Sequence, residues 1–491
     1  MNDLPIIIIL FPLISALLSL PLSKINKHLG RNVVAISIFA AFVCSVKLLA
    51  KVIHNGAIRY TFGGYKAPYG IEFYIDSIGA IIVLIILLLG FITVLYTMNF
   101  EVTNERKIIG GAYALISLLI VGMCGMTLTG DVFNLYVFLE ITSLSGYCLI
   151  ALGGSRGIVA SFRYLLVGTV AATMYLLGVG ILYASTGTLN MTDMRSILDS
   201  QDYTVQMTVS MCLFIGAFGI KMPMFPFHGW QPSAYTHAEP GSRPLIVGIM
   251  GKIPALAMFR YLYIIYGTDF KYFNLFLTII GVLSCIGIIY GSIRAMAQED
   301  IRKIFAYSSI AQIGYITLGF SIGNSYALAG AFLHLIGHVF MKSGLFFSSA
   351  AIRYRFGNFE LSSFGRIYKK MPITSALIVL ASLSMIGIPP TVGFFSKWYI
   401  ALGAVQNHQF VYLAVLVLSS LLNAIYFFKL IEKIFINKPT ELNDRREGEV
   451  RELPISMLIA IVTCFVAIIA IGVLNVSVVD VIMMTVKGVG I

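Results

Sequence analysis

The stretch GIKMPMFPFHGWQPSAYTHAEPGSRPLIVGIMGK, residues 219–252, interrupts a chain that otherwise consists of long apolar segments. It contains two lysines, two histidines, a glutamate and five prolines. Lys221 stands just before Pro223 and Pro226, and each proline removes a backbone donor from a helix. Carbonyls freed in this way cannot face lipid, so they must face protein, water or an ion path. A lysine beside a break in a membrane helix therefore favours a site of ion transport.

The composition around this stretch is that of an integral membrane protein. Of the 491 residues, 58% are hydrophobic and 11% are charged, a balance far from that of a soluble domain. We expect an all-α protein with a single membrane domain over residues 1–491, and a chain of this length has room for about fourteen membrane helices. The expected spans lie near residues 4–22, 32–52, 73–99, 108–128, 131–152, 161–184, 205–227, 245–266, 272–296, 303–322, 326–351, 373–403, 409–432 and 453–487.

Lys and Arg are distributed unevenly among the loops between these spans. Twenty-one of them fall in odd-numbered loops and six in even-numbered loops. Because basic loops stay in the cytoplasm, we expect a multi-pass protein of the cell (plasma or inner) membrane with both termini outside the cytoplasm. Loop 353–370 should then be cytoplasmic, loop 187–202 external, and residues 437–452 a solvated connection. Topology also explains the +12 net charge, so no nucleic-acid partner is expected.

The break at residues 219–230 recurs later in the chain. Four residues reappear at a constant offset of 168 positions, and both copies are interrupted by prolines. The matching pairs are Gly219 and Gly387, Ile220 and Ile388, Phe227 and Phe395, and Trp230 and Trp398. Five spans separate the copies, so two halves of opposite topology are indicated, as in inverted-repeat transporters.

Ionisable side chains lie deep inside the expected spans. Glu140 follows Asp131, which opens a span, by nine residues, so its carboxylate should lie about 13 Å deep, near the bilayer centre. A carboxyl group at that depth is either neutral or needs a cation, and Lys221 and Lys252 are the nearest candidates. The alternative is a purely structural pair that locks two helices together.

His334, His338 and Lys342 follow one another at i, i+4 and i+8, so they share one helix face. Two histidines in register with a lysine indicate a proton relay, although a single buried histidine would more often be structural. Haem is not expected, because two axial histidines must approach the iron from opposite sides. Lys397 follows the second proline break and has the same setting as Lys221.

Two further charges, Arg260 and Asp76, stand near span ends and are expected to extend to the membrane surface. The six cysteines stand singly in apolar segments, which predicts neither a disulfide framework nor a metal site. No cofactor is expected.

Four segments together resemble a known family. They are DVFNLYVFLEITSLSGY (131–147), KMPMFPFHGWQPSAY (221–235), QEDIRKIFAYSSIAQIGYI (298–316) and HLIGHVFMKSGLFF (334–347). They are similar to the proton-conducting antiporter-like subunits of Mrp-type Na⁺/H⁺ antiporters, complex I and membrane-bound hydrogenases, and most resemble the Mrp D subunit or its hydrogenase counterpart. The resemblance implies fourteen helices, with helices 1–3 at 1–107, inverted five-helix repeats at 108–266 and 272–432, broken helices 7 and 12, and a C-terminal helix at 453–491.

The resemblance also implies which residues translocate ions. The family has a row of charged residues at mid-membrane, here called the charged axis. It matches Glu140, Lys221, Lys252, His334, His338 and Lys397. We add Lys342 because it lies on the same helix face as the two histidines. One departure lies at residues 231–244. Ser233 stands where the family motif has an aspartate, and the chain gains His237, Glu239 and Arg243.

We therefore expect an ion-translocating subunit of a multisubunit membrane complex, which moves protons, with exchange for Na⁺ also compatible. Making and breaking the Glu140–Lys221 pair would load and release a proton, and Lys252 and the histidines would pass it toward Lys397. The alternative is a pump module of a redox-driven complex, either a membrane-bound hydrogenase or a quinone oxidoreductase. Its redox centres would lie in other subunits, because the sequence has no Fe–S cysteine spacing and no dinucleotide-binding glycine pattern. Whether the chain is part of an enzyme is thus left open, and its expected partners are other membrane subunits, the lipid bilayer, H⁺ and Na⁺.

Overall fold

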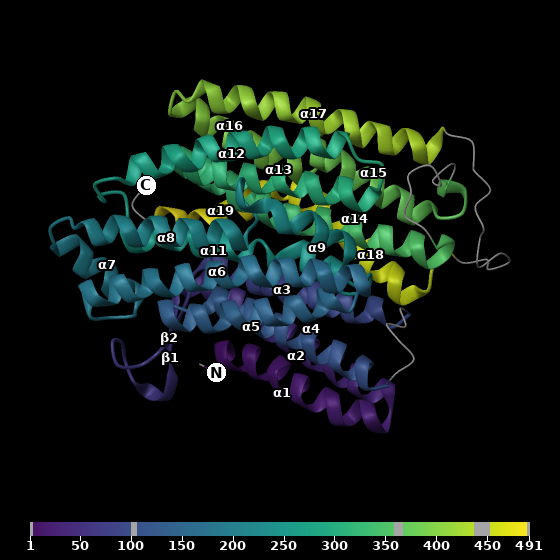
Figure 1. Cartoon of the computed structure of the whole chain (residues 1–491), viewed down its shortest axis with the longest axis horizontal. Helices are drawn as coiled ribbons and strands as arrows, with labels where there is room; N and C mark the ends of the chain where they lie inside the picture. Colours follow the sequence, from purple (N-terminus) through teal and green to yellow (C-terminus); the bar gives the residue numbers. More distant parts are fainter. Residues whose placement is uncertain (1–2, 100–105, 358–366, 437–451, 489–491) are drawn as a thin grey trace.

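The computed structural model describes residues 3–99, 106–357, 367–436 and 452–488, and this part of the chain is predominantly helical (Figure 1). Eleven of its helices are long and apolar enough to cross a membrane. Residues 437–451 of the predicted connection 437–452 lie outside the described residues, as does the middle of the predicted cytoplasmic loop 353–370.

The amino-terminal part contains three long helices and a small sheet. Strands β1 and β2 pair antiparallel, with Ile58 opposite Ile75. The predominantly helical fold is as expected, but the span expected from residue 73 begins only at Ser77, because Glu72–Ile75 is a strand. The elements are α1 (Leu4–Ile25), α2 (Lys27–Asn55), β1 (Ile58–Thr61), η1 (Phe62–Gly64), β2 (Glu72–Ile75) and α3 (Ser77–Thr97).

The middle part contains the stretch from which the sequence analysis began. Helix α8 ends at Lys221, because Pro223 and Pro226 cannot donate to it, and short helical turns follow. The elements are α4 (Arg106–Leu128), α5 (Val132–Ala151), α6 (Ser155–Thr186), α7 (Met191–Ser200), α8 (Val205–Lys221), η2 (Phe227–Trp230) and α9 (Gln231–His237). The next helix, called helix 243–266 below, consists of α10 (Arg243–Leu245), η3 (Ile246–Met250), α11 (Ile253–Phe259) and η4 (Arg260–Tyr266).

The carboxy-terminal part is helical throughout the residues described. Its elements are α12 (Phe273–Met296), α13 (Ile301–Ile322), α14 (Ser325–Phe356), η6 (Ile367–Lys369), α15 (Pro372–Ile386), α16 (Val392–Gln406), α17 (Phe410–Phe435), α18 (Ile455–Val473) and α19 (Asn475–Lys487). A five-residue connection that includes Pro389 and Pro390 separates α15 from α16.

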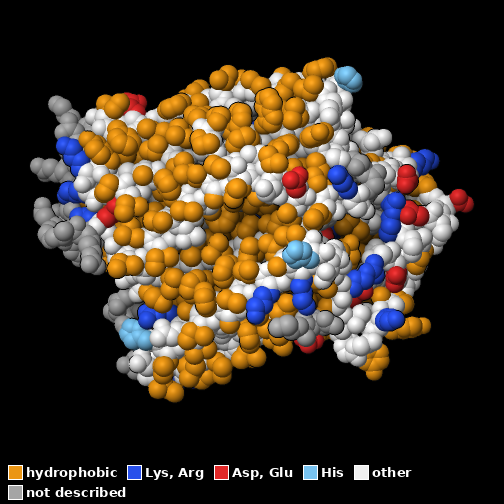
Figure 2. Space-filling view, turned by 180° about the vertical axis from the view of Figure 1, so that it is seen from behind, with side chains coloured by type: hydrophobic (Ala, Val, Ile, Leu, Met, Phe, Trp, Pro, Cys, Tyr) orange, Lys and Arg blue, Asp and Glu red, His pale blue; other side chains and the backbone are white. Residues whose placement is uncertain are grey.

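Two helices form the enclosed centre of this bundle. The apolar windows of helix 243–266 and of α14 are completely buried, whereas that of α17 is 28% buried. Hydrophobic side chains cover most of the face seen in Figure 2, and charged side chains gather toward its two ends. The hairpin, α7 and the C-terminus lie toward one end of the helices, which we call the hairpin end (Figure 1).

The packing of α18 against the α15–α16 connection generates a prediction about stability. A Cβ at Gly472 would lie 2.2 Å from the carbonyl oxygen of Pro390, whereas a Cβ at Gly180 would meet no atom within 4 Å. Gly472→Ala should therefore lower the free energy of unfolding by about 1–3 kcal/mol through overpacking. Gly180→Ala, the matched control in a helix interior, should be neutral or slightly stabilising. Thermal unfolding of both variants in detergent checks this, and equal midpoints would contradict the close contact.

Candidate functional site

The structure brings Glu140 and Lys221 together. Lys221 Nζ lies 3.6 Å from Glu140 Oε1, and the lysine side chain is 3% exposed against 28% for the glutamate. Lys221 also donates a hydrogen bond of 2.7 Å to Ser143 Oγ, one helical turn after Glu140 on α5. Glu140 Oε1 has no hydrogen-bond donor among the described residues. The pair is thus close and largely buried, yet it is held by a charge contact rather than by a direct hydrogen bond.

Lys252 occupies the middle of helix 243–266, where the π-helical turn η3 has just ended. Its side chain is buried, and Nζ donates to the carbonyl oxygen of Val247. A π-helical turn leaves carbonyls outside the regular hydrogen-bond ladder, so the backbone itself supplies an acceptor for the ammonium group. No acidic partner of Lys252 is found among the described residues, so it does not join the Glu140 pair directly.

His334 and His338 lie completely buried on one face of α14, as the sequence spacing predicts. His334 Nδ1 lies 2.9 Å from Ser396 Oγ, and its Nε2 lies 2.9 Å from Gln312 Oε1. Neither ring nitrogen of His338 has a partner in the described part of the chain. The two rings stack with centroids 5.9 Å apart. One histidine is therefore anchored, and the other is left with unused hydrogen-bonding capacity.

Both remaining lysines are held by backbone carbonyls. Lys342 Nζ donates to Phe305 O at 2.7 Å and to Ser308 Oγ at 2.5 Å. Lys397 Nζ donates to Met385 O at 3.0 Å and to Ile386 O at 2.9 Å. Those two carbonyls stand at the end of α15, where the helix stops and leaves its last acceptors free.

A chain of buried hydroxyl and amide groups on α13 and α17, which we call the polar chain, was not predicted. Ser308 on α13 accepts from Lys342, and its own hydroxyl donates to Phe305 O at 3.1 Å. The Tyr426 hydroxyl donates to Asn423 Oδ1 at 2.7 Å, and Asn423 Nδ2 donates to the Tyr315 hydroxyl at 3.0 Å. Both bonds run in one donor direction, from Tyr426 through Asn423 to Tyr315.

The far end of the polar chain lies beside the last lysine. Lys397 Nζ lies 4.7 Å from the centre of the Tyr315 ring and 3.2 Å from Ser420 Oγ. The signal for this chain was present in the sequence, because Asn423 is a lone amide in the apolar helix α17. A polar side chain in an apolar span requires a buried partner. The sequence therefore identifies Asn423 as a buried polar residue, but it does not reveal the partners of its amide group.

Arg260 and Asp76 correct the expectation that both extend to the membrane surface. Their side chains are 2% and 5% exposed, and Arg260 Nη2 lies 3.6 Å from Asp76 Oδ2. Asp76 also caps α3, accepting from Gly79 N at 2.6 Å. Both charges are therefore part of the interior.

The unusual segment 231–244 forms a compact turn outside the charged axis. Glu239 accepts from the backbone of Gly241 and Ser242 at 2.8 and 2.6 Å, and the buried Arg243 donates to Ala238 O. Arg302, at the start of α13, donates to Thr236 O at 3.2 Å.

Arg302 also pairs with the loop residue Asp300 at 2.6 Å. Burial acts to raise the pKa of the Asp300 carboxyl, but the bonds from Arg302 hold that pKa below its ordinary value. This ion pair joins the loop before α13 to the turn 231–237.

Comparison with known proteins places this geometry in a family. Residues 129–423 match the family model described as NADH:quinone oxidoreductase/Mrp antiporter, TM. The chain belongs to this family. It is 40% identical, over 96% of both chains, to NADH-quinone oxidoreductase subunit N of Desulforudis audaxviator (strain MP104C). It is 31% identical, over 86% of this chain and 85% of the relative, to the Na(+)/H(+) antiporter D subunit of Bacillus subtilis (strain 168).

A solved structure shares the fold over nearly the whole chain. It is a chain of the membrane-bound sulfane sulfur reductase, an archaeal respiratory membrane complex, with a TM-score of 0.90 and 26% identity. The superposition covers 99% of this chain and 98% of that one. The resemblance on which the sequence analysis relied is thereby confirmed at the level of the family.

The contrast between the two histidines generates a prediction. His338→Leu removes no side-chain hydrogen bond, so the variant should assemble normally while ion transport falls at least about tenfold if the ring carries protons. His334→Leu, the matched control one turn away, strands Gln312 and Ser396 and should cost about 1–3 kcal/mol of stability. Transport in vesicles and thermal unfolding of both variants check this. Normal transport in a stable His338→Leu protein would exclude the ring from the path.

Proposed function

We propose that this chain is an ion-translocating subunit of a multisubunit membrane complex and that it moves protons along the row of charged residues inside the bundle. The observation that carries the proposal is the loosely held Glu140–Lys221 pair beside the end of α8. Its proposed partners are the other membrane subunits of an Mrp-type, hydrogenase or complex I-like assembly. The names of the relatives support this choice, because they belong to antiporter and respiratory complexes.

The finer architecture is part of the proposal. We assign fourteen spans by adding α13, the α8–α9 segment and the α15–α16 segment to the eleven long apolar helices. The last two are the broken helices 7 and 12, and inverted repeats occupy 108–266 and 272–432, between helices 1–3 at 1–107 and the C-terminal helix at 453–491. The ends of α8 and α15 support this assignment, since each places a lysine beside a break.

In the proposed mechanism the first proton carrier is Lys221. While Glu140 is near, its carboxylate and the Ser143 hydroxyl stabilise the charged ammonium group. When the pair separates, the buried lysine loses its counter-charge and releases the proton. Because Glu140 makes no competing hydrogen bond through Oε1, its side chain can move without breaking one. Making and breaking the pair therefore changes which form of Lys221 is favoured.

The proposed path then crosses the centre of the bundle. Lys252 is the next carrier, and the unpartnered His338 leads on to His334. Lys397 receives the proton at the second break, where carbonyls of α15 hold its ammonium group. Lys342 lies at the other end of the histidine face, and its charge acts on the same row through space.

Two forms of energy coupling fit this path. The first form is exchange of H⁺ for Na⁺, which the name of the antiporter relative indicates. Redox-driven pumping is favoured by the 40% identity to a NADH-quinone oxidoreductase subunit and by the fold shared with a respiratory complex. In the second form the redox centres lie in other subunits, and this chain uses conformational energy supplied by them. The subunit composition of the purified complex separates the two forms.

The Glu140–Lys221 pair gives the decisive test of transport. Lys221→Ala removes the carrier, and Glu140→Ala leaves a buried ammonium group without its counter-charge, so each should abolish transport. The double variant should also be inactive, because two neutral residues cannot carry a proton. Under a structural-pair interpretation each single change would cost about 3–5 kcal/mol, whereas the double change would be nearly neutral. Proton transport in vesicles at matched complex levels decides, and an active double variant would refute the assignment.

Orientation is tested separately. We propose that the protein lies in the cell membrane with the hairpin end and both termini outside the cytoplasm, which the basic loops at the opposite end support. Tyr69→Cys, 95% exposed in the wild-type hairpin connection, should then react with a membrane-impermeant maleimide added to intact cells. Lys369→Cys, exposed before α15, should react only in inverted vesicles. The reverse pattern would invert the proposed topology.

A further inference from the structure

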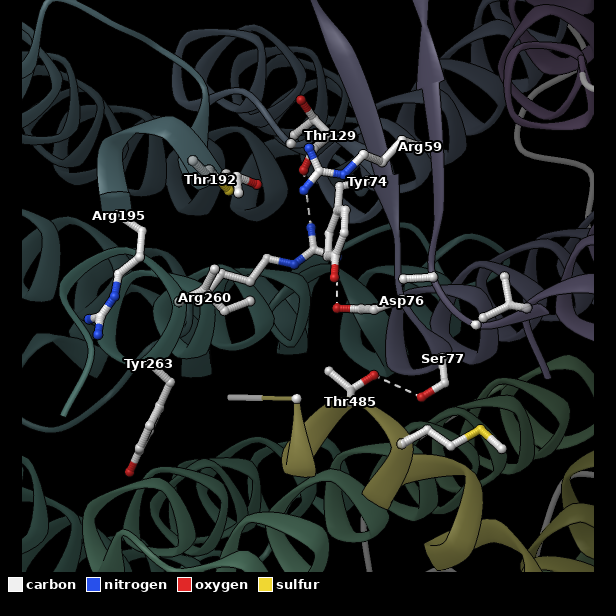
Figure 3. A pocket seen from close by; sticks show the side chains of 18 residues that line it. Arg59, Tyr74, Asp76, Ser77, Thr129, Thr192, Arg195, Arg260, Tyr263 and Thr485 are labelled. Atoms are coloured by element: carbon white, nitrogen blue, oxygen red, sulfur yellow. Dashed lines mark hydrogen bonds and ion pairs between the residues drawn. The ribbon is translucent and has the colours of Figure 1, made fainter. Parts of the chain in front are cut away.

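A cavity of about 460 Å³ lies at the hairpin end, away from the charged axis (Figure 3). The hairpin, the start of α3, the turn between α4 and α5, α7, η4 and α19 all contribute to its wall. Thr192 and Arg59 line it and are exposed, so the cavity reaches the surface of the molecule. None of the residues assigned above to the charged axis lines it.

A buried ion pair stands at the wall of this cavity. Arg260 Nη1 donates to Thr129 O at 3.2 Å, and Nη2 lies 3.6 Å from Asp76 Oδ2. Among the described residues, Arg260 Nε and Nη2 have no hydrogen-bond acceptor, and Asp76 Oδ2 has no donor. Figure 3 shows Arg260 and Asp76 reaching toward each other across the cavity wall, beside Tyr74. Three buried polar atoms at this wall thus have no hydrogen-bond partner among the described residues.

The donor and acceptor capacity of these three atoms indicates which molecule can occupy the cavity. The two arginine nitrogens require an acceptor, while the carboxylate oxygen requires a donor. An anion would satisfy the arginine but be repelled by Asp76, and a metal cation would satisfy Asp76 but be repelled by Arg260. Water both donates and accepts. The cavity is many times larger than the roughly 30 Å³ that one molecule occupies in liquid water.

We propose that this cavity is a hydrated vestibule and that the Asp76–Arg260 pair is the gate between it and the charged axis, an inference that rests on the proposed function. Arg260 follows Lys252 by eight residues in helix 243–266, so the vestibule ends about 12 Å along the helix axis from that carrier. Arg260 also contacts Thr129, in the turn just before the helix that bears Glu140. The gate therefore touches the helix that bears Lys252 and the turn that precedes the helix of Glu140.

The gate works by charge. While the pair is closed, the fixed positive charge of Arg260 at the inner wall opposes the entry of Na⁺ and hydronium from the vestibule. The gap of 3.6 Å and the missing hydrogen bonds make the pair easy to separate, because water can replace each contact as it opens. Opening moves the arginine charge aside and connects the water on that side with the carriers.

Gly79 allows the pair to form. A Cβ at this position would lie 2.8 Å from Asp76 Oδ1 and 3.2 Å from Arg260 Nη2. Gly79→Ala therefore forces the two side chains apart while keeping both charges.

Cysteine accessibility tests the vestibule without reference to transport. Ser77→Cys places a thiol in the cavity wall, and Ser45→Cys is the control, since Ser45 is equally buried but lies outside the cavity. In the full-length protein in membrane vesicles, the cationic, membrane-impermeant reagent MTSET should modify Ser77→Cys from the hairpin side only. The intact mass, compared with that of the parent protein, reports the modification. Protection of Ser77→Cys, or equal modification of Ser45→Cys, would show that the cavity is dry and overturn the proposal.

A deeper thiol tests the gate. Thr127 is completely buried on α4, two residues before the Thr129 that Arg260 contacts, and does not line the cavity. Thr127→Cys should stay protected from MTSET while the pair is intact and react at least tenfold faster when combined with Arg260→Gln. Arg59→Gln, which removes a vestibule charge outside the pair, is the matched control and should leave Thr127→Cys protected.

If Arg260→Gln fails to fold, Gly79→Ala replaces it, with the same expected gain in reactivity. Equal rates with and without the pair would overturn the gate. Failure of the proposed function is recognised independently, because an active Glu140/Lys221 double variant would leave these accessibility results unchanged.

Discussion

An ammonium group inside an apolar helix bundle must be surrounded by oxygen atoms, and this constraint explains the irregular features of the structure. Removing such a charge from water costs several kcal/mol unless hydrogen bonds and counter-charges replace the lost solvation. Helix ends and π-helical turns are the places where a bundle has oxygen acceptors to spare. Lys252 and Lys397 lie at such places and bind carbonyls there. Lys221 stands at the end of α8, where it meets a serine and a glutamate.

The lysines differ in the groups that stabilise their charged form. In the proposed mechanism this difference determines where a proton transfer begins. Lys221 alone among the four lysines of the described axis has a carboxylate within 4 Å. The other three have only neutral oxygens, so their charged forms are held by dipoles that do not move away. In the proposed mechanism, an event that displaces Glu140 acts first on Lys221, and the change reaches Lys252 and the histidines only as a change in electrostatic potential. The proposed site then has one switchable pair and a series of fixed carriers.

The sequence predicted the helical membrane fold and the positions of the helices well, because apolar runs of about twenty residues are a strong signal. It also identified Lys221 as one of two candidate partners of Glu140 and placed both histidines on one helix face, since both inferences use helix geometry alone. The β1–β2 hairpin was missed because Glu72–Ile75 is short and joins directly to an apolar helix. The polar chain was missed for another reason. Tyr315, Asn423 and Tyr426 come from two helices that are far apart in sequence, α13 and α17, and no local pattern specifies how helices meet.

The error over Arg260 is informative because the rule used was reasonable. A charged residue near a span end usually extends to the surface, and its long side chain makes that inexpensive. Here Asp76 caps α3 and Gly79 lies in its first turn, and the small glycine lets Arg260 approach the carboxylate. A counter-charge within reach changes the balance, since the arginine can stay inside without being unpaired. Whether a terminal charge faces inward thus depends on the residue that caps a neighbouring helix, which the arginine's own helix does not reveal. The same reasoning applies to the lysines of the axis, because each was recognisable as buried, but its oxygen partners come from breaks and turns in the backbone that only the three-dimensional structure displays.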